Sequence, residues 1–351
     1  MKKYLVIAAL LSLTVAAPQI AHGQKKKAKP VKKAVGQQTV VLGTNQLLGE
    51  FGKVGATYTI GKERPLNFTL ISAEYRPDRF VGGNFYDQTE GWVPLKGQKL
   101  LVIKYTVQNP KSEDARLWYN SFEITAVSGD DQNSTMLNHP WIGSQTAYKE
   151  IQLKPGQKAT LTGALYVSGQ GEVPKLMIRR EQDPSAAVIR YDLRGKVAKI
   201  ADTAYSEDGV TVKDTVDAKL ETYYPWMGSD FQVLGVEDVA TKIPDLGTPN
   251  DYRQVAIKLK FRGVTPEPGR VWYGDFNVHL NTSDGDSSNF KTYSRLFRAA
   301  RNETFDGVVP VGEEQTLRLV VDVPNGVNIT GFSLMCHHNE DIHRTFKFSL
   351  K

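Results

Sequence analysis

The sequence predicts an all-β protein that is built from two consecutive antiparallel β-sandwiches. Two observations lead to this fold class. Many short segments alternate apolar and polar residues with a period of two, and the chain repeats one such stretch. LVIKYTVQNP and ARLWYNSFEITA, in residues 101–126, return 154 positions later as VAIKLKFRGV and GRVWYGDFNVHL. Because two strands and their connection share one offset, we expect two tandem copies of one fold unit.

The first strand of the repeated stretch predicts one buried and one exposed face. Its apolar side chains Leu101, Ile103, Tyr105 and Val107 occur at every second position, and polar residues fill most of the others. The second copy keeps this spacing with Val255, Ile257, Leu259 and Phe261. Period-two alternation is typical of antiparallel strands with one face against a core.

The second strand of the repeated stretch carries large aromatic residues. When residues 118–124 are taken as one continuous strand, the first tryptophan and the phenylalanine four positions later share the inward face. The same spacing recurs in the second copy. We therefore expect four core anchors, and not ligand platforms: Trp118, Phe122, Trp272 and Phe276.

The N-terminus resembles a secretory signal. Lys2 and Lys3 precede a short apolar run that ends at Ala17, and a small-residue site precedes Gln24. This order predicts a Sec-type signal peptide over residues 1–23, cleaved before Gln24. Since no other apolar run approaches the ~18 residues that span a bilayer, we expect no transmembrane segment. The protein is expected to be secreted or periplasmic, and the short lysine-started signal favours a bacterial cell.

A lysine-rich segment follows the signal over residues 24–38. It holds six lysines and no acid; without these and the two signal lysines, the net charge changes from +6 to −2. A segment so poor in apolar residues is expected to be a disordered tail. It serves either as a solvated spacer or as a tether to anionic surface polymers or phospholipid headgroups, and the export signal disfavours nucleic acid.

The rest of the chain is expected to form a first sandwich over residues 39–195, a linker over residues 196–213, and a second sandwich over residues 214–351. The boundary rests on a polar, acid-rich segment that contains Gly195 and Gly209. Cys336 is the sole cysteine, so an intrachain disulfide is excluded and apolar burial has to hold both sandwiches together. The short strands between Gly, Pro and Asp turns favour a two-sheet antiparallel sandwich in each unit.

The first unit resembles a family of exported bacterial immunoglobulin-like domains typified by the mycobacterial immunoprotective extracellular antigen. The resemblance rests on a strand that ends in Asn109, a following strand with Phe122 and Ile124, and an L-x-P-G sequence at residues 153–156. The second unit departs from this pattern, because Gly263 replaces the strand-end asparagine. The resemblance implies a secreted sandwich and no catalytic residues.

Two groups of residues are candidate binding sites. Three imidazoles near Cys336 could ligate zinc or copper, although their spacing fits no structural zinc motif and equally predicts a solvated turn: His337, His338 and His343. Aromatic residues beside Pro or Gly in predicted loops could stack on sugars or fill a protein pocket, unless they pack onto their own sandwich: Phe85, Tyr86, Trp92, Trp141, Tyr223, Tyr224 and Trp226.

The sequence lacks the common catalytic motifs, namely the G-x-S-x-G elbow, the phosphate-binding loop, the dinucleotide glycine fingerprint and H-E-x-x-H. We therefore expect no enzyme and no cofactor. The favoured function is a secreted binding or scaffolding protein of the cell envelope, with an unidentified protein or glycan partner. Two alternatives stay open: a carbohydrate-binding protein that uses the loop aromatics, and a metal-responsive protein that uses the C-terminal histidines.

Overall fold

The computed structural model describes residues 51–61, 64–83, 89–136, 141–142, 146–147, 150–180, 188–265, 270–285, 292–338 and 341–350. Within these ranges the chain is almost entirely β-structure, and its helical turns are η2 (Pro244–Leu246) and η3 (Tyr273–Asp275). The predicted all-β class is confirmed. No helix among the described residues is long and apolar enough to cross a bilayer. The predicted signal peptide and lysine-rich tail lie outside the described residues.

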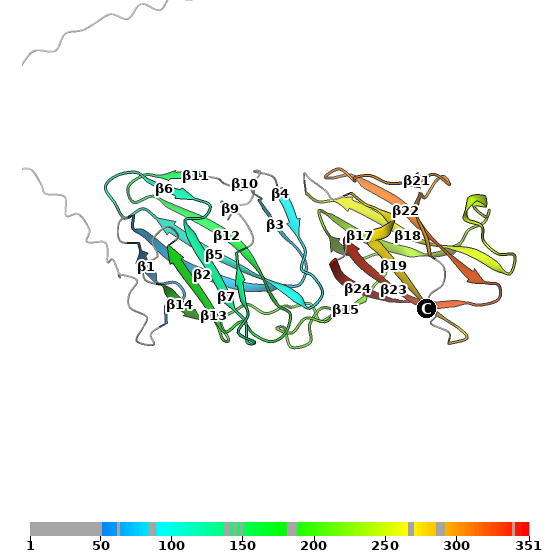
Figure 1. Ribbon diagram of the computed structural model, residues 1–351, viewed down its shortest axis with the longest axis horizontal. Coiled ribbons are helices and arrows are strands. Elements are labelled where there is room, and N and C mark those ends of the chain that lie inside the picture. The colour runs from blue at the N-terminus through cyan, green and yellow to red at the C-terminus, as the bar shows by residue number, and fades with distance from the viewer. Residues whose placement is uncertain are drawn as a thin grey trace, which may run out of the picture. The chain divides into compact units, whose positions relative to one another are not determined.

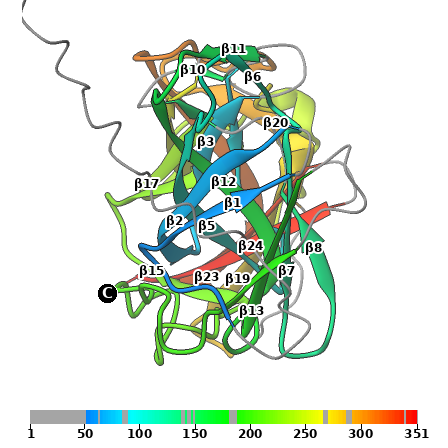
Figure 2. The same ribbon diagram turned by 90° about the vertical axis from the view of Figure 1, so that its left-hand side faces the viewer.

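The N-terminal half contains two main antiparallel sheets, and Figure 2 shows β2, β5 and β12 on one side and β7, β8 and β13 on the other. The six-stranded sheet has the order β1 (Thr57–Ile60), β2 (Leu66–Arg76), β5 (Gln98–Gln108), β12 (Lys158–Ser168), β9 (Trp141–Ile142), β10 (Thr146–Ala147). The four-stranded sheet has the order β14 (Ile189–Asp192), β13 (Lys175–Arg180), β7 (Phe122–Val127), β8 (Asn133–Thr135). Two small sheets pair β6 (Ala115–Trp118) with β11 (Glu150–Leu153), and β3 (Phe80–Gly83) with β4 (Thr89–Trp92).

The C-terminal half also contains one six-stranded and one four-stranded sheet, and Figure 1 shows its strands in yellow-green to red. The six-stranded sheet has the order β16 (Tyr223–Trp226), β17 (Ser229–Asp238), β18 (Tyr252–Gly263), β22 (Glu314–Pro324), β20 (Thr292–Arg298), β21 (Thr304–Phe305). The four-stranded sheet has the order β15 (Thr215–Ala218), β24 (Asp341–Ser349), β23 (Ile329–His338), β19 (Phe276–Thr282).

The central strands of the two halves pair in equivalent registers. Lys104 in β5 lies opposite Ser72, and Lys258 in β18 lies opposite Gly235. Both β2 and β17 contain a register shift immediately before that partner, so even the bulge recurs at the equivalent place. On the other side of the same lysines lie Thr162 and Arg318, respectively. The three central strands therefore pair in the same register in both halves.

Apolar side chains at alternate positions of these strands form the core. Leu101 and Ile103 are fully buried, and their counterparts Val255 and Ile257 are buried as well. The predicted core anchors Phe122 and Phe276 are buried as well. Each buried side chain of this size contributes about 1.5–3 kcal/mol to folding, so the sheets are held together mainly by apolar burial.

The prediction that Trp118 and Trp272 anchor the core is wrong. Trp272 is 40% exposed, and Trp118 is only partly buried. Residues 118–124 are not one strand, because a turn separates β6 from β7, and the alternation therefore does not continue through it. The residue before each tryptophan is the one that is fully buried, namely Leu117 in the first half and Val271 in the second.

The predicted linker, residues 196–213, is a packed segment and not an extended polar connection. Ile200, Tyr205 and Val212 are buried in it. The segment also joins β2 through backbone hydrogen bonds, because Ala198 donates to the Ala73 carbonyl and accepts from the Tyr75 amide. The prediction of a linker relied on the polar composition of the segment and did not take these three apolar side chains into account.

Two buried cations hold this segment in place. Lys99 is fully buried, donates to the carbonyls of Gly171 and Val210, and lies 4.4 Å above the ring of Tyr75. Arg344 from β24 donates to the Lys213 carbonyl and to two further carbonyls, those of Pro77 and Gln98. Burial lowers the pKa of Lys99 to about 8.

We expect higher pH to stabilise the wild-type protein relative to a Lys99→Met variant. Between about pH 8 and 10, folded Lys99 has released its proton, whereas an unfolded lysine with its pKa near 10.4 retains it. Because the unfolded state then binds more protons, the stability difference grows in favour of the wild type, by on the order of 1–2 kcal/mol. Urea unfolding of both proteins at several pH values measures this difference, and a constant difference would refute it.

Candidate functional site

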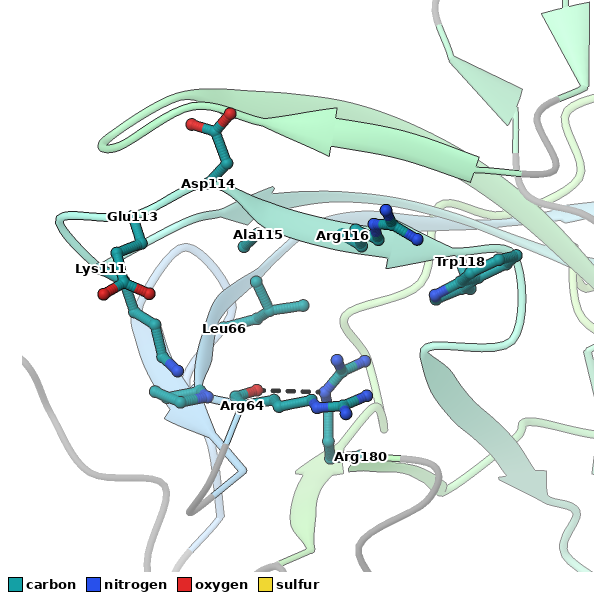
Figure 3. Close-up of a pocket in the computed structure, with 10 residues that line it drawn as sticks. Arg64, Leu66, Lys111, Glu113, Asp114, Ala115, Arg116, Trp118 and Arg180 are labelled. Carbon is teal, nitrogen blue, oxygen red and sulfur yellow. Dashed lines mark hydrogen bonds between the residues drawn. The ribbon is translucent and has the colours of Figure 1, made fainter.

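A cavity of about 480 Å³ opens at the end of the N-terminal half, where the β1–β2 hairpin, β6 and β13 meet. Figure 3 shows side chains from all three elements around it. Its lining consists of Arg64, Pro65, Leu66, Lys111, Glu113, Asp114, Ala115, Arg116, Trp118 and Arg180. We call this cavity the end pocket.

Buried Asn109 fixes the loop that leads into the end pocket. Its side-chain amide donates to the carbonyl of Glu113 at 2.6 Å and to that of Leu153 at 2.9 Å. Its Oδ1 accepts the amide N–H of Lys111 at 3.0 Å. The fully buried asparagine therefore connects the loop to Leu153 at the end of β11. In this way residues 111–114 are held at the mouth of the pocket.

The second half lacks this arrangement. Gly263 occupies the position of Asn109 and makes the equivalent backbone hydrogen bonds to Gly312 and Glu313. A Cβ atom at Gly263 would lie only 2.1 Å from the Pro310 carbonyl oxygen, so no side chain fits there. The loop-fixing asparagine is thus confined to the first half.

Arg180 forms the floor of the end pocket. It ends β13 opposite Phe122, and its guanidinium lies 5.4 Å from that ring. The guanidinium donates to the Ser121 and Arg64 carbonyls, which hold it in place. The turn beneath it requires Gly61, whose φ is +93° and whose added Cβ would lie 3.0 Å from the Arg64 carbonyl oxygen. Backbone geometry and a buried cation together shape the floor.

Arg116 and Trp118 form the wall above this floor, and both come from β6 (Figure 3). The guanidinium of Arg116 is 3.4 Å from the carboxylate of Glu150 on the neighbouring strand β11, and its side chain is 69% exposed. The amide of Trp118 donates to Ser121 Oγ at 2.8 Å, which fixes the turn after the strand. The wall therefore combines an exposed cation with a partly buried indole.

Charges are unevenly distributed around the end pocket. Four cationic side chains and two carboxylates line it. In Figure 3 the carboxylates of Glu113 and Asp114 lie toward one end, whereas Arg116, Arg180 and Trp118 lie toward the other. The lining contains no imidazole, thiol or hydroxyl side chain. The arrangement suits the binding of an anion beside an aromatic surface.

Two of the candidate binding aromatics are core residues, in agreement with the alternative that these rings pack onto their own sandwich. Tyr224 and Trp226 are buried, and the indole of Trp226 packs 5.4 Å from the ring of Phe276. The YYPW sequence forms β16, an edge strand, where Pro225 leaves no ladder hydrogen bond unmade. The prediction that both lie in exposed loops is therefore wrong.

Of the remaining candidate aromatics whose side chains the structure describes, Tyr223 lies in β16 and Trp92 in β4, which belong to different sheets. Tyr223 is half-buried under Arg262, and its hydroxyl donates to Glu314 at 2.6 Å; burial and this bond raise its pKa to about 12. Trp92 is half-buried against a small cluster with Phe80. Trp141 belongs to the short strand β9. Phe85 and Tyr86 lie outside the described residues.

The C-terminal histidines lie in two paired strands, because His337 and His338 end β23 and His343 belongs to β24. His343 is buried and His337 half-buried, and the backbone of His338 pairs with Asp341. Within the described part of the chain, no group of three His, Cys, Asp or Glu side chains is placed to hold a metal ion. Burial raises the pKa of the Cys336 thiol well above its usual range, which makes it a poor metal ligand.

No protein-family model and no curated protein matches the chain. Among solved structures, it is similar to an uncharacterised β-sandwich protein from Clostridium difficile at 11% identity, with 41% of this chain and 96% of that chain covered and a TM-score of 0.30. The secreted protein MPT63 of Mycobacterium tuberculosis aligns at 13% identity over 41% and 96%, with a TM-score of 0.29. A Bacillus subtilis lipoprotein described as putative aligns at 10% identity over 40% and 39%, with a TM-score of 0.26.

Sequence analysis did not identify the end pocket. Its cations come from three separate places, near Arg64, between Lys111 and Arg116, and at Arg180. The signal that was available is the strand-end Asn109, which marks a loop that is fixed from within.

Proposed function

We propose that the protein is a secreted or periplasmic, non-enzymatic binding protein of the bacterial cell envelope, which binds an anionic partner in the end pocket. The observation that carries this proposal is the cation-rich cavity with an indole in its wall. Its lining combines cationic groups with an apolar surface, as a binding site for an anion requires. The signal-like N-terminus and the lysine-rich segment support export and an anionic partner.

The proposal includes two tandem copies of one immunoglobulin-like sandwich, of the exported family that the first copy resembles. The equal registers of the central strands support it. So does a repeated ion pair: Arg116 with Glu150 in the first half corresponds to Arg270 with Asp306 in the second. The two ion pairs follow the offsets of the surrounding strands. The second copy, which lacks the asparagine-fixed loop, has a scaffolding role.

Titration of the mature protein with two anionic polymers tests this function. The probes are an oligosaccharide of galacturonic acid, which carries carboxylates, and poly(glycerol phosphate), which carries phosphates. We expect at least one to bind, with an affinity that falls as salt rises and falls about tenfold in Arg116→Gln. The matched control is Arg194→Gln, an exposed arginine outside the pocket. The proposal would be contradicted if neither polymer bound the protein. It would also be contradicted if Arg116→Gln bound the polymers with the same affinity as the control Arg194→Gln.

A second candidate function is carbohydrate binding. The observation that favours it is the partly buried Trp118 in the wall of a cavity, and not the loop aromatics on which the sequence prediction relied. An oligosaccharide without charge distinguishes the two functions, because it binds only if the sugar face itself is recognised.

A further inference from the structure

We infer that the ligand of the end pocket is an acidic saccharide, with a sugar ring against Trp118 and its carboxylate at the guanidinium groups of Arg116 and Arg64. This inference rests on the proposed function and narrows the anion to one chemical class. It combines three features of the lining: the segregated charge, the fixed floor and the apolar surface beside the indole.

The charge of the lining selects an anion at one end only. Cations exceed carboxylates by two, and Glu113 and Asp114 lie away from Arg116 and Trp118 (Figure 3). Asp114 is also engaged with Gln152 Nε2 at 2.8 Å. An anionic group that enters beside Arg116 thus meets cations first. A guanidinium binds a carboxylate through two parallel hydrogen bonds, which fixes the orientation of the group as well as attracting it.

Arg116 is able to exchange its present partner for a ligand. Its ion pair with Glu150 is 3.4 Å long and solvent-exposed, so the pair contributes little stability. Arg180 has the opposite character, because it is 8% exposed and is bound to backbone carbonyls. It therefore supplies a fixed positive charge beneath the ligand, while Arg116 and the exposed Arg64 supply the direct contacts.

The apolar part of the lining distinguishes a sugar from a small inorganic anion. Trp118 and Ala115, which are both partly buried, provide apolar surface next to the cations. A phosphate ion has no apolar face with which to cover them, whereas the C–H face of a sugar ring packs against an indole. The cavity volume of about 480 Å³ lies within the range of small-ligand pockets and has room for one or two sugar rings. A uronic acid matches both parts of the lining.

Isothermal titration of the mature protein with tetragalacturonate, its methyl ester and inorganic phosphate tests the inference. The ester keeps the rings and removes the charge. We expect the acid to bind at least tenfold more tightly than the ester, and phosphate not to compete at equal concentration. Trp118→Leu and Arg116→Gln should each lower the affinity for tetragalacturonate about tenfold, and the control Arg194→Gln should leave it unchanged. Circular dichroism of each variant verifies that it is folded.

The possible failures are distinguishable. If poly(glycerol phosphate) binds in an Arg116-dependent manner and tetragalacturonate does not, the inference is overturned and the proposed function stands. The inference is also overturned if the ester binds as tightly as the acid, or if Trp118→Leu binds the acid like the wild type. If neither polymer binds, both the inference and the proposed function are overturned.

Discussion

An Asn109→Ala variant is expected to lose about 3 kcal/mol of unfolding free energy and to release the loop at residues 109–114. The substitution removes two donors and one acceptor from a fully buried side chain. Each buried polar group left without its partner costs about 1–3 kcal/mol, and the carbonyls of Glu113 and Leu153 both lose theirs. Urea unfolding measures the loss, and hydrogen exchange of the Lys111 amide reports the loop.

The contrasting control for this prediction is the equivalent position in the second half. Gly263→Asn places the same side chain in the same backbone setting, but its Cβ meets the Pro310 carbonyl oxygen at 2.1 Å. We expect this variant to be destabilised by steric overlap, so each position tolerates only its own residue. An exposed asparagine, Asn133→Ala, should be neutral. An Asn109→Ala protein as stable as the wild type would show that the loop is held by other contacts.

An Asp230→Ala variant is expected to lose about 3–5 kcal/mol, the largest loss for a single charged residue of this protein. Asp230 accepts from Arg79 at 2.6 Å and from Arg262 at 2.8 Å. The side chain of Arg79 is only 8% exposed, and it also donates to the carbonyls of Met227 and Ser229. Burial lowers the pKa of Arg79, and Asp230 opposes that effect. Without the Asp230 carboxylate, the buried guanidinium of Arg79 loses the counter-charge that it contacts directly.

Chemical unfolding of Asp230→Ala beside Asp306→Ala tests this expectation. Asp306 pairs with Arg270 through a similar guanidinium–carboxylate contact, but at a solvent-exposed site. We expect no measurable loss from that exposed pair, because water and salt screen it. If both substitutions lowered the unfolding free energy equally, burial would not determine how much the Arg79–Asp230 pair contributes to stability.

Sequence analysis predicted the sheets well, because strand periodicity and the repeat offset are local properties of the chain. The repeat predicts that Lys104 and Lys258 are equivalent, and each lies opposite the residue that follows the register shift of the neighbouring strand, Ser72 or Gly235. The prediction failed where a turn interrupted the period, and so Trp272 was assigned to the core although it is 40% exposed.

Two further errors have a common physical origin. Trp226 was assigned to a loop because Pro225 precedes it, yet a proline is compatible with an edge strand and the indole is buried. The end pocket was not predicted, because Arg64, Arg116 and Arg180 come together only when the hairpin, β6 and β13 are assembled. Side-chain convergence of this kind is a property of tertiary structure, and no local pattern encodes it.

Hydrogen exchange with and without the anionic polymers of the binding titrations tests the central claim most directly, because it locates the binding site without a substitution. If the end pocket binds the partner, amides in residues 64–66 and 111–118 exchange more slowly with ligand, and those in residues 270–275 of the second half are unchanged. Protection confined to the second half, or absent from residues 111–118, would contradict the account.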